Sequence, residues 1–313
     1  MKIYVSGSLA YDRIMGFPGK FEEHILPEKI HLINVSFVVN GITEKFGGTA
    51  GNIAYSLNLL EEKATILAAV GKDFEAYETR LRENGLPLDG ILRRDDVLTS
   101  GAYITTDLAN NQITGFNPGA MNYPAHNGFR HPDDETALAI IAPGNTEDML
   151  AYSRIYKEQS IPYIFDPGQQ IIALPNEHIA EIITGSQLLI SNDYELQMIQ
   201  KATGHTKDEI QALTGALVVT LGDEGSVLHY NGTEMPIPAA RADRVVDPTG
   251  AGDAYRAGLI KGMISGKDLS VAARMGSVIA SFSVECSGTQ EHDCTVADFQ
   301  ARYRESYGEE VYW

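Results

Sequence analysis

The amino-acid sequence predicts an α/β fold, with a mostly parallel sheet covered by helices and a small inserted β-sheet. Short apolar runs alternate with amphipathic segments along most of the 313 residues. These runs are apolar almost throughout, as expected for parallel strands that are buried on both faces. Two segments, residues 11–46 and 98–118, interrupt this alternation with patterns that are more typical of antiparallel strands.

Six apolar runs are predicted to form the main sheet. The amphipathic stretches between them favour parallel pairing through crossover helices. The runs are Ile3–Ser6, Thr65–Val70, Leu138–Ala142, Tyr163–Asp166, Leu188–Asn192 and Leu217–Leu221. Ligands of such a sheet bind outside the carboxyl ends of its strands, so the functional site is expected there.

Several local signals mark the ends of helices and hairpins. Asp73–Asn84 is predicted to be a helix that ends at Gly85, because glycine readily adopts the left-handed backbone of a helix end. Thr146 and Thr206, each followed by acidic residues, are predicted to open two further helices. The Asn-Gly pair within Tyr230–Glu234 predicts a tight hairpin.

The two interrupting segments are predicted to form a β-sheet lid within a single domain, residues 1–313. Residues 98–118 hold two alternating runs about a polar Asp107–Asn111 turn, which indicates a hairpin. Residues 11–46 contain Pro and Gly interruptions, and the apolar alternation around Ile33–Val39 favours a strand over a helix. An exposed edge of this lid could pair with a second copy, so we expect a monomer or a homodimer.

Charge and composition exclude several classes of partner. Lys and Arg number 24 against 42 Asp and Glu, which gives a net charge of −18. We therefore expect no nucleic-acid or membrane partner, and any phosphate-bearing ligand must be small and held by backbone N–H groups or a metal. No signal-like or membrane-length apolar run is visible, and the two cysteines lack CxxC spacing, so a cytoplasmic location is expected.

The segment DPTGAGDAYRAGLIKGM, which begins at Asp247, predicts an anion site. Gly250, Ala251 and Gly252 are small residues directly before an amphipathic helix, where several backbone N–H groups and the helix dipole favour an anion. No obvious Lys or Arg clamp accompanies them. Asp253 follows in the first helical turn, either to satisfy the helix dipole or as a general base, and we favour the base because an anion site suits an unpaired carboxylate poorly.

A second glycine-rich element, Phe46-Gly47-Gly48, precedes a helix predicted over Ile53–Leu60. Asn52 offers both donors and an acceptor, which suits a vicinal diol. Asp12 follows the first strand and could accept hydroxyl protons. Taken alone, a pair of glycines is more often a structural turn than a binding site.

Together, the Gly47–Asn52 and Asp247–Asp253 elements resemble the two signatures of the ribokinase-like (PfkB) family of carbohydrate and nucleoside kinases. The resemblance spans essentially the whole chain, and the second signature is highly specific. Pro248 lengthens the common DTxGAGD form to DPTGAGD, which looks like the adenosine and nucleoside kinase branch. The segments GSLAYDRIM, EHILPEKIHLINVSF, ITTDLANNQITGFNPGAM and FDPGQ also look like bacterial nucleoside kinases of adenosine kinase type.

The resemblance implies a ribokinase-like three-layer αβα core and a lid that closes over a sugar. It implies that Asp253 is the catalytic base and that the residues before it form the anion hole, namely Gly250, Ala251 and Gly252. It further implies that ribose hydroxyls are held by Asp12, Gly48 and Asn52. In the lid, Gln112 and Phe116 are candidates for contact with the nucleoside base, although a lid aromatic could equally be lid core; Gln169 is a candidate for a hydroxyl or a phosphate.

On the donor side, the resemblance implies that Asn192 and Glu195 organise Mg²⁺ and its waters, mainly through water. Their spacing alone favours a helix cap instead, and both roles could hold. Asp247 is a candidate neighbour of a K⁺ or other metal ion. The nucleotide is expected beside a TLGxxG loop and the last helices, at Asn192, Thr220, Gly222, Gly225, Ala280 and Ser283.

The sequence thus predicts an ATP-dependent kinase that transfers the γ-phosphoryl group to the 5′-hydroxyl of a ribonucleoside, adenosine first. Mg²⁺ with ATP is the expected cofactor. One alternative is a family kinase for a free sugar such as ribose or fructose, which would need no partner for a base. The other is a nucleoside-binding sensor without turnover, which would not need a base and a metal motif together.

Overall fold

The computed structural model describes residues 1–25, 32, 34–132 and 135–313. Its centre is a nine-stranded sheet in the order β13-β12-β11-β10-β9-β8-β1-β4-β5. The strands, in chain order, are β1 (Lys2–Ser6), β4 (Thr65–Val70), β5 (Ile91–Arg93), β8 (Ala137–Ile141), β9 (Tyr163–Phe165), β10 (Leu188–Asn192), β11 (Leu217–Thr220), β12 (Ser226–Tyr230) and β13 (Thr233–Ile237). All six predicted strands are confirmed; the three-residue β5 lies beyond them.

Pairing from β5 across to β11 is parallel throughout, whereas β12 and β13 add an antiparallel edge. The predicted hairpin at Tyr230–Glu234 forms this edge. Asn231 and Gly232 both have positive φ, at 51° and 71°, as a tight turn between twisted strands requires.

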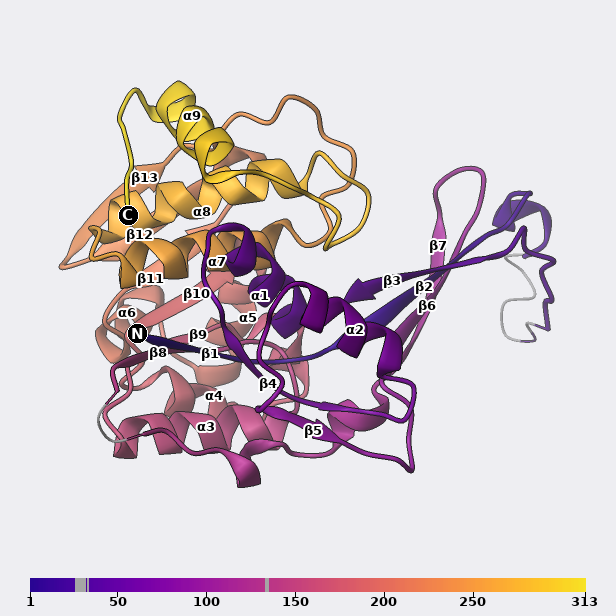
Figure 1. Ribbon diagram of the computed structural model, residues 1–313, viewed down its shortest axis with the longest axis horizontal. Coiled ribbons are helices and arrows are strands. Elements are labelled where there is room, and N and C mark those ends of the chain that lie inside the picture. Colours follow the sequence, from indigo (N-terminus) through magenta and orange to yellow (C-terminus); the bar gives the residue numbers. More distant parts are fainter. Residues whose placement is uncertain (26–31, 33, 133–134) are drawn as a thin grey trace.

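Helices cover both faces of the sheet because neighbouring strand residues bury their side chains on opposite sides. Ile3 and Val5 pack in one core with Leu57 and Leu259, whereas Tyr4 packs in the other core. The first face carries α1 (Thr49–Leu59), α2 (Glu75–Glu83), α7 (Ala251–Ile264) and α8 (Leu269–Ser283), with α9 (Val296–Tyr307) packed on α8; the second carries α3 (Thr146–Glu158), α4 (Asn176–Ile183), α5 (Asp193–Thr203) and α6 (Lys207–Leu213). This is the three-layer arrangement that the sequence predicts (Figure 1).

The ends of the predicted helices agree with their local signals. The α2 helix is followed by Gly85 at φ 63°, and α3 and α6 begin directly after or at the predicted threonines. The α1 helix begins at Thr49 rather than at the predicted Ile53. The prediction missed this first turn because its small residues show no apolar periodicity. Of the helices formed by the described residues, none has the length and apolarity needed to cross a bilayer.

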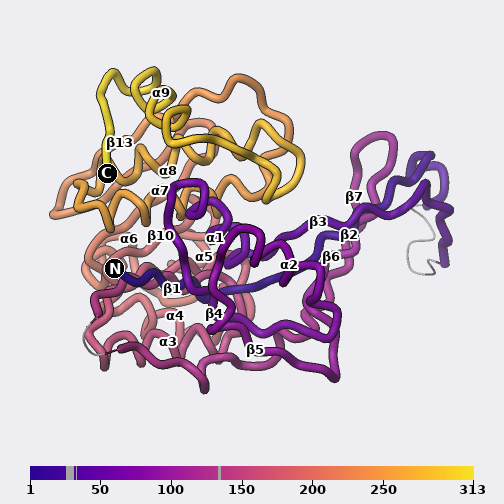
Figure 2. Tube along the Cα trace, in the orientation of Figure 1, coloured from indigo at the N-terminus to yellow at the C-terminus, as the bar shows by residue number. Residues whose placement is uncertain are grey.

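A separate four-stranded sheet stands off one end of the main body, while both chain termini lie toward the other end (Figures 1 and 2). Its order is β3-β2-β6-β7, from β2 (Ala10–Gly16), β3 (Ile42–Gly47), β6 (Ser100–Thr106) and β7 (Gln112–Asn117). The hairpin predicted within 98–118 is therefore confirmed. The strand predicted around Ile33–Val39 is wrong for the described residues 34–39, which form no strand, and residue 33 lies outside the described part.

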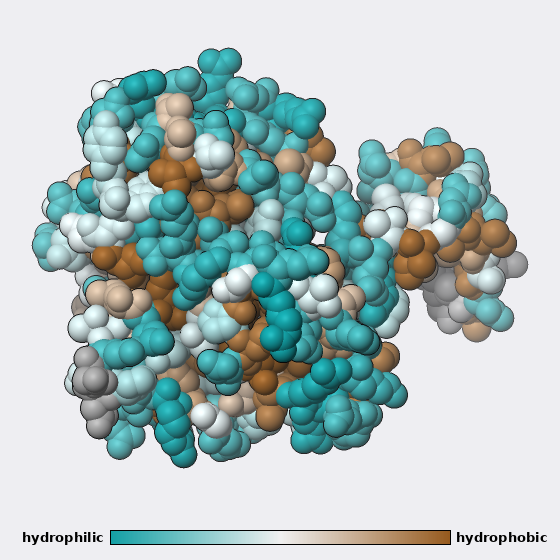
Figure 3. Space-filling view, viewed as in Figure 1, coloured by the Kyte–Doolittle hydropathy of each residue, from teal (hydrophilic) through white to brown (hydrophobic). Residues whose placement is uncertain are grey.

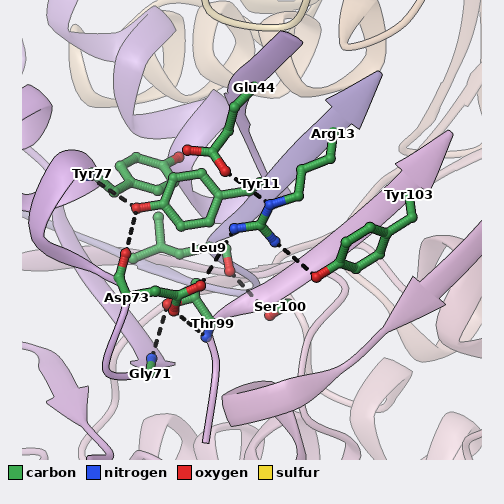
Figure 4. A network of polar contacts seen from close by, with 10 residues as sticks. All are labelled: Leu9, Tyr11, Arg13, Glu44, Gly71, Asp73, Tyr77, Thr99, Ser100 and Tyr103. Carbon is green, nitrogen blue, oxygen red and sulfur yellow. Dashed lines mark hydrogen bonds and ion pairs between the residues drawn. The ribbon is translucent and has the colours of Figure 1, made fainter. Parts of the chain in front are cut away.

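Polar contacts join this small sheet to the main body (Figure 4). The Arg13 guanidinium on β2 donates to Asp73, just before α2, at 3.4 Å and to Glu44 on β3 at 2.8 Å. The Tyr11 hydroxyl donates to the Asp73 carbonyl at 3.0 Å, and the Asp73 carboxylate accepts from the Thr99 N–H at 2.6 Å. Asp73, in the loop before α2, thus holds the start of β2 and the residue before β6 close together.

Candidate active site

Two adjoining cavities lie at the carboxyl ends of the parallel strands, where the sheet topology favours ligand binding. The first, between the main body and the small sheet, has a volume of about 620 Å³ and is here called the junction cavity. The second, of about 540 Å³, lies over the ends of β8 to β11 and is here called the strand-end cavity. Each is large enough for a small-molecule ligand. They share four lining residues, Thr49, Gln169, Gly250 and Asp253.

The two cavities bring together most of the predicted site residues. The junction cavity is lined by Asp12, Gly48, Asn52, Phe116, Gln169, Gly250 and Asp253. The strand-end cavity is lined by Asn192, Glu195, Thr220, Gly222 and Gly252, together with the shared residues. The predicted acceptor side and donor side are therefore separate places that meet at Asp253.

Two of the shared residues, Gly250 and Asp253, lie at the N-terminus of α7 and form one part of the wall between the cavities. Gly250 caps the helix with φ 83°, and a Cβ there would meet the Thr289 side chain at 2.9 Å, so both backbone and space require glycine. The Ala251 N–H is already engaged with the Pro248 carbonyl at 3.2 Å. Within the described residues, the N–H groups of Gly252 and Asp253 have no protein acceptor and remain open to an anion.

Asp253 is the ionisable group at the centre of this wall. Its Oδ2 accepts a hydrogen bond from the Asn52 Nδ2 at 2.8 Å. Burial raises the pKa of Asp253 to about 7, against the opposing effects of the Asn52 hydrogen bond and the Arg256 charge; the Asp166 charge raises it further. A carboxyl group with a pKa near neutrality is suited to taking up a proton during catalysis at that pH.

Arg256 is a basic side chain beside the anion site, where the sequence showed no obvious Lys or Arg clamp. Its buried guanidinium lines the strand-end cavity and binds Asp166 with both ends, at 2.8 and 2.9 Å. A third contact reaches the Gly252 carbonyl at 3.1 Å. Because Asp166 neutralises it at close range, Arg256 supplies a local field and a rigid support for the turn rather than an unpaired clamp.

Asp12, on β2, also lines the junction cavity. Burial raises its pKa, the Asp247 charge raises it further, and the Lys45 ammonium opposes both. Gly48, the N-cap of α1, lies beside it, with Asn52 one helical turn later. The acceptor side therefore has a carboxylate and an amide that can hold hydroxyl groups.

Asn192 and Glu195 form a complete capping box at the start of α5. The Asn192 Oδ1 accepts from the Glu195 N–H at 2.7 Å, and the Glu195 Oε2 accepts from the Asn192 N–H at 2.8 Å. Burial raises the pKa of Glu195 despite the Asn192 hydrogen bond. The cap expected from the spacing is present, and it orients both side chains at the cavity wall.

The donor set of the strand-end cavity fits Mg²⁺ that is shared with phosphates. Asp166 and Glu195 line the cavity as hard oxygen ligands, but Asp166 is already paired with Arg256. Among the described residues, no three His, Cys, Asp or Glu side chains are grouped to hold a metal by themselves. Mg²⁺ commonly takes one or two carboxylates, several waters and substrate phosphates, and this site offers that smaller protein share.

Six predicted residues lie outside both cavities, among them Ala251 of the predicted anion hole. Gln112 pairs with Thr106 at the far end of β7, four residues from Phe116 and therefore about 13 Å away along the strand. Ser283 is fully buried in α8, and Gly225 has φ 97° in a turn against the Ile237 carbonyl. The other two are Ala280 and Asp247. Their nucleotide and substrate roles stay predictions.

Asp247 supports the anion loop from outside. Its carboxylate accepts from the Thr249 N–H at 2.9 Å and from the Gly288 N–H at 3.2 Å. Burial alone would raise the pKa of Asp247, but these hydrogen bonds outweigh it and hold the pKa below its usual value. The carboxylate thus remains charged and links the loop to the segment after α8; its role beside a cation stays a prediction.

Several residues that line the cavities or contact their lining were not predicted from the sequence. Arg256 lies three residues after Asp253 on the same helix, so helical spacing could have suggested it. Pro118, Met121 and Thr289 also line the junction cavity, but they carry no local signal. Gln290, which contacts Asn52 at 3.0 Å, is separated from it by 238 residues and could not be found by spacing.

Comparison with known proteins agrees with this geometry. The pfkB family carbohydrate kinase profile matches residues 23–295. A nucleoside kinase of Methanocaldococcus jannaschii is 32% identical over 266 residues, 84% of this chain and 87% of that protein. The structure of Burkholderia thailandensis nucleoside kinase in complex with inosine superposes with a TM-score of 0.86 at 36% identity, over 98% of this chain and 99% of the other.

A structure of the same Burkholderia protein in complex with ADP-inosine has a TM-score of 0.84 at 38% identity, over 98% and 97% of the two chains. The profile and the relatives cover most of this chain, and the profile includes the α7 loop and the whole lining of the strand-end cavity. The chain therefore belongs to the pfkB family of carbohydrate kinases and is a phosphotransferase that acts on an alcohol group.

Proposed function

We propose that this protein is an ATP-dependent nucleoside kinase that transfers the γ-phosphoryl group to the 5′-hydroxyl of a ribonucleoside. The observation that carries the proposal is the position of Asp253, at the wall shared by the two cavities and beside the open N–H groups of α7. An alcohol in the junction cavity and a phosphate in the strand-end cavity would both reach it.

The reaction needs a proton acceptor and a place for charge to develop. The Asp253 carboxylate accepts the proton of the attacking hydroxyl, while the Gly252 and Asp253 N–H groups stabilise the transferring phosphoryl group. When bound with ATP, Mg²⁺ supplies neutralisation of the donor phosphates, and Asn192 and Glu195 are the residues that would hold it, mainly through water. The protein itself positions the hydroxyl and the phosphoryl group and supplies a fixed electrostatic field around them.

The acceptor side favours a nucleoside over a free sugar. Asp12 and Asn52 hold the ribose hydroxyls, and the junction cavity continues to an apolar wall of Phe116, Pro118 and Met121. An aromatic and an apolar wall suit the faces of a base, which a free sugar lacks. Adenosine is our first candidate, and the complex of the Burkholderia relative with inosine makes inosine the second.

The small sheet is proposed to act as a lid over the acceptor. Its β7 contributes Phe116 to the junction cavity, and its β2 contributes Asp12. Closure would exclude water from the transferring phosphoryl group and prevent hydrolysis of the donor.

The proposal is tested by ADP formation from ATP and Mg²⁺ with adenosine, inosine, cytidine, ribose and fructose as separate acceptors. We expect the highest kcat/KM with a purine nucleoside. Turnover with ribose or fructose above that with every nucleoside would favour the sugar kinase. Nucleoside binding by calorimetry without ADP formation would favour the sensor and contradict the proposal.

A further inference from the structure

A chain of buried side chains runs from the main body to Asp253. The Tyr77 hydroxyl donates to the Gly47 carbonyl at 2.8 Å. The Gln290 Nε2 donates to the Tyr77 hydroxyl at 2.7 Å and to the Asn52 Oδ1 at 3.0 Å. Tyr77, Gln290 and Asn52 are 0%, 2% and 4% exposed, so these contacts are sheltered from competing water.

The chemistry of the chain allows one direction of donation. The Gly47 carbonyl can only accept a hydrogen bond, so the Tyr77 hydroxyl donates its one hydrogen to that carbonyl. The same hydroxyl must therefore accept from Gln290. Gln290 must therefore present its NH₂ group, and both of its hydrogens are used. The Asn52 amide, which faces that NH₂ group, must present its oxygen to Gln290 and its nitrogen to Asp253.

The fold makes space for this chain at Gly51, in the first turn of α1. A Cβ at Gly51 would collide with the Tyr77 hydroxyl and approach the Gln290 Nε2 at 3.0 Å. Glycine inside a helix lowers its stability relative to alanine. Glycine at this position leaves room for the Tyr77 hydroxyl and the Gln290 amide, which is a physical reason for its presence.

Resting on the function proposed above, we propose that Gln290 is a positioning residue that locks the Asn52 amide with its nitrogen toward Asp253. The lock leaves the second hydrogen of the Asn52 Nδ2 for an acceptor hydroxyl, so Asn52 meets the substrate as a donor. It also keeps one oxygen of Asp253 occupied by a donor and leaves the other for the attacking hydroxyl.

A donor to the charged form of Asp253 lowers its pKa, because the hydrogen bond favours the carboxylate. Loss of the lock should therefore raise that pKa. Other charged groups around Asp253 are unchanged by substitution of Gln290; they are Arg256 on α7, Asp166 after β9, Asp12 on β2, and Asp193 and Glu195 on α5.

The test uses Gln290→Met, which keeps a similar volume without a donor. The pKa of the Asp253 carboxyl is measured from its ¹³C chemical shift, assigned by its loss in Asp253→Asn. We expect the pKa in Gln290→Met to be about one unit above that of the wild type, and the acid limb of kcat to move equally. An unchanged pKa and an unchanged limb, whatever the melting temperature, would overturn the proposal.

Tyr77→Phe is the second variant, in case Gln290→Met does not fold. It removes the acceptor that orients Gln290, and we expect a smaller shift in the same direction. Tyr163→Phe is its matched control, because that buried hydroxyl also donates to a backbone carbonyl, of Ile182 at 2.7 Å, outside both cavities. Equal behaviour of Tyr77→Phe and the control would contradict the lock.

Wild-type turnover separates the two claims. A wild type that forms no ADP with any nucleoside would contradict the proposed function, whereas the carboxyl titration still decides the role of Gln290. Normal wild-type turnover with no effect in the Gln290 and Tyr77 variants would contradict the role of Gln290 alone.

Discussion

Asp253 combines a local helix position with a long-range environment. Its place in the first turn of α7 would ordinarily favour the carboxylate, since the helix dipole stabilises negative charge there. Burial reverses this preference and raises its pKa to about 7. At neutral pH a substantial fraction of Asp253 is therefore ionised, and this ionised form can accept a proton.

This pKa makes a prediction for activity. The base must be ionised, so kcat/KM should rise as pH increases through about 7 and level off above it. A pH profile measured with saturating ATP and Mg²⁺ checks this. A rate that is constant from pH 5.5 to 8.5 would contradict a titrating base at Asp253.

The raised pKa of Asp253 also affects stability. Activity requires the ionised form, whereas the folded protein is most stable with the protonated form. Because the folded-state pKa is raised from 3.8, the folded protein binds the proton more tightly than the unfolded chain. The associated stability is fully present below pH 4 and is lost as pH rises through about 7. Asp253→Asn should therefore be stabilised relative to wild type by about 1 to 2 kcal/mol at pH 8, and by less at pH 5.

Asp12 provides the residue-scale test of acceptor binding. Asp12→Ala removes the carboxylate proposed to hold ribose hydroxyls, so the nucleoside Kd should rise by about 10-fold or more, at about 1.5 kcal/mol or more for a charge-assisted hydrogen bond. Calorimetry checks this. Asp95→Ala, at a carboxylate with 92% side-chain exposure, controls for the change in net charge; an affinity of Asp12→Ala equal to this control would remove Asp12 from the site.

At the scale of elements, the α7 N-terminus depends on a glycine at Gly250. Gly250→Ala should cost about 1 to 2 kcal/mol for the positive φ, with a further penalty from contact with Thr289. It should also lower kcat, because the Gly252 and Asp253 N–H groups move with the turn. Gly232→Ala has a similar φ of 71° with open space around its Cβ, so it isolates the backbone penalty; thermal melts and kcat that match this control would contradict the role of the turn.

The small sheet supplies the element-scale test of base recognition. Figure 3 shows apolar side chains on the projecting part of the molecule. On β7, Phe116 is 52% and Ile113 46% exposed. Phe116→Ala should raise KM for a nucleoside about 5- to 150-fold, from the ~1 to 3 kcal/mol typical of stacking on a base. Ile113→Ala, on the same strand but outside the cavity, should leave KM unchanged; equal effects would show that only the strand's packing matters.

The sequence predicted those elements whose signals are local. Parallel strands such as Leu188–Asn192 are recognisable because both faces are apolar, and the capping box at Asn192 is recognisable from its three-residue spacing. The parallel pairing of β2 with β6 has no local signal, because the strands are separated by the whole of α1, β4 and α2. The apolar alternation at 34–39 suggested a strand, but alternation alone does not supply a pairing partner.

Site residues were likewise predicted where a local sequence motif carries them and missed where only long-range packing does. Gly250 and Asp253 were visible because a short motif carries them, and Arg256 was accessible through helical spacing. The Asp166 partner of Arg256 and the Gln290 partner of Asn52 come from segments 90 and 238 residues away. Such contacts depend on the packing of α7 against the sheet and of the segment after α8 against α1, which no local pattern encodes.

For the whole molecule, the net charge of −18 constrains how an anion is bound. The fold concentrates favourable groups at one place, namely the α7 N–H groups, the Arg256–Asp166 pair and the capped start of α5. Both cavities are lined by Asp253, so the proposed donor and the proposed acceptor would each reach it. We therefore expect that a substitution can abolish phosphoryl transfer without weakening acceptor binding.

The most direct measurement of this claim compares Asp253→Asn with wild type in two assays. ADP formation gives kcat, and calorimetry gives the nucleoside Kd. We expect a fall in kcat of about 100-fold or more, as is typical when a general base is lost, with a Kd within about threefold of wild type. A variant that keeps most of its kcat would contradict Asp253 as the base on which the proposed function rests.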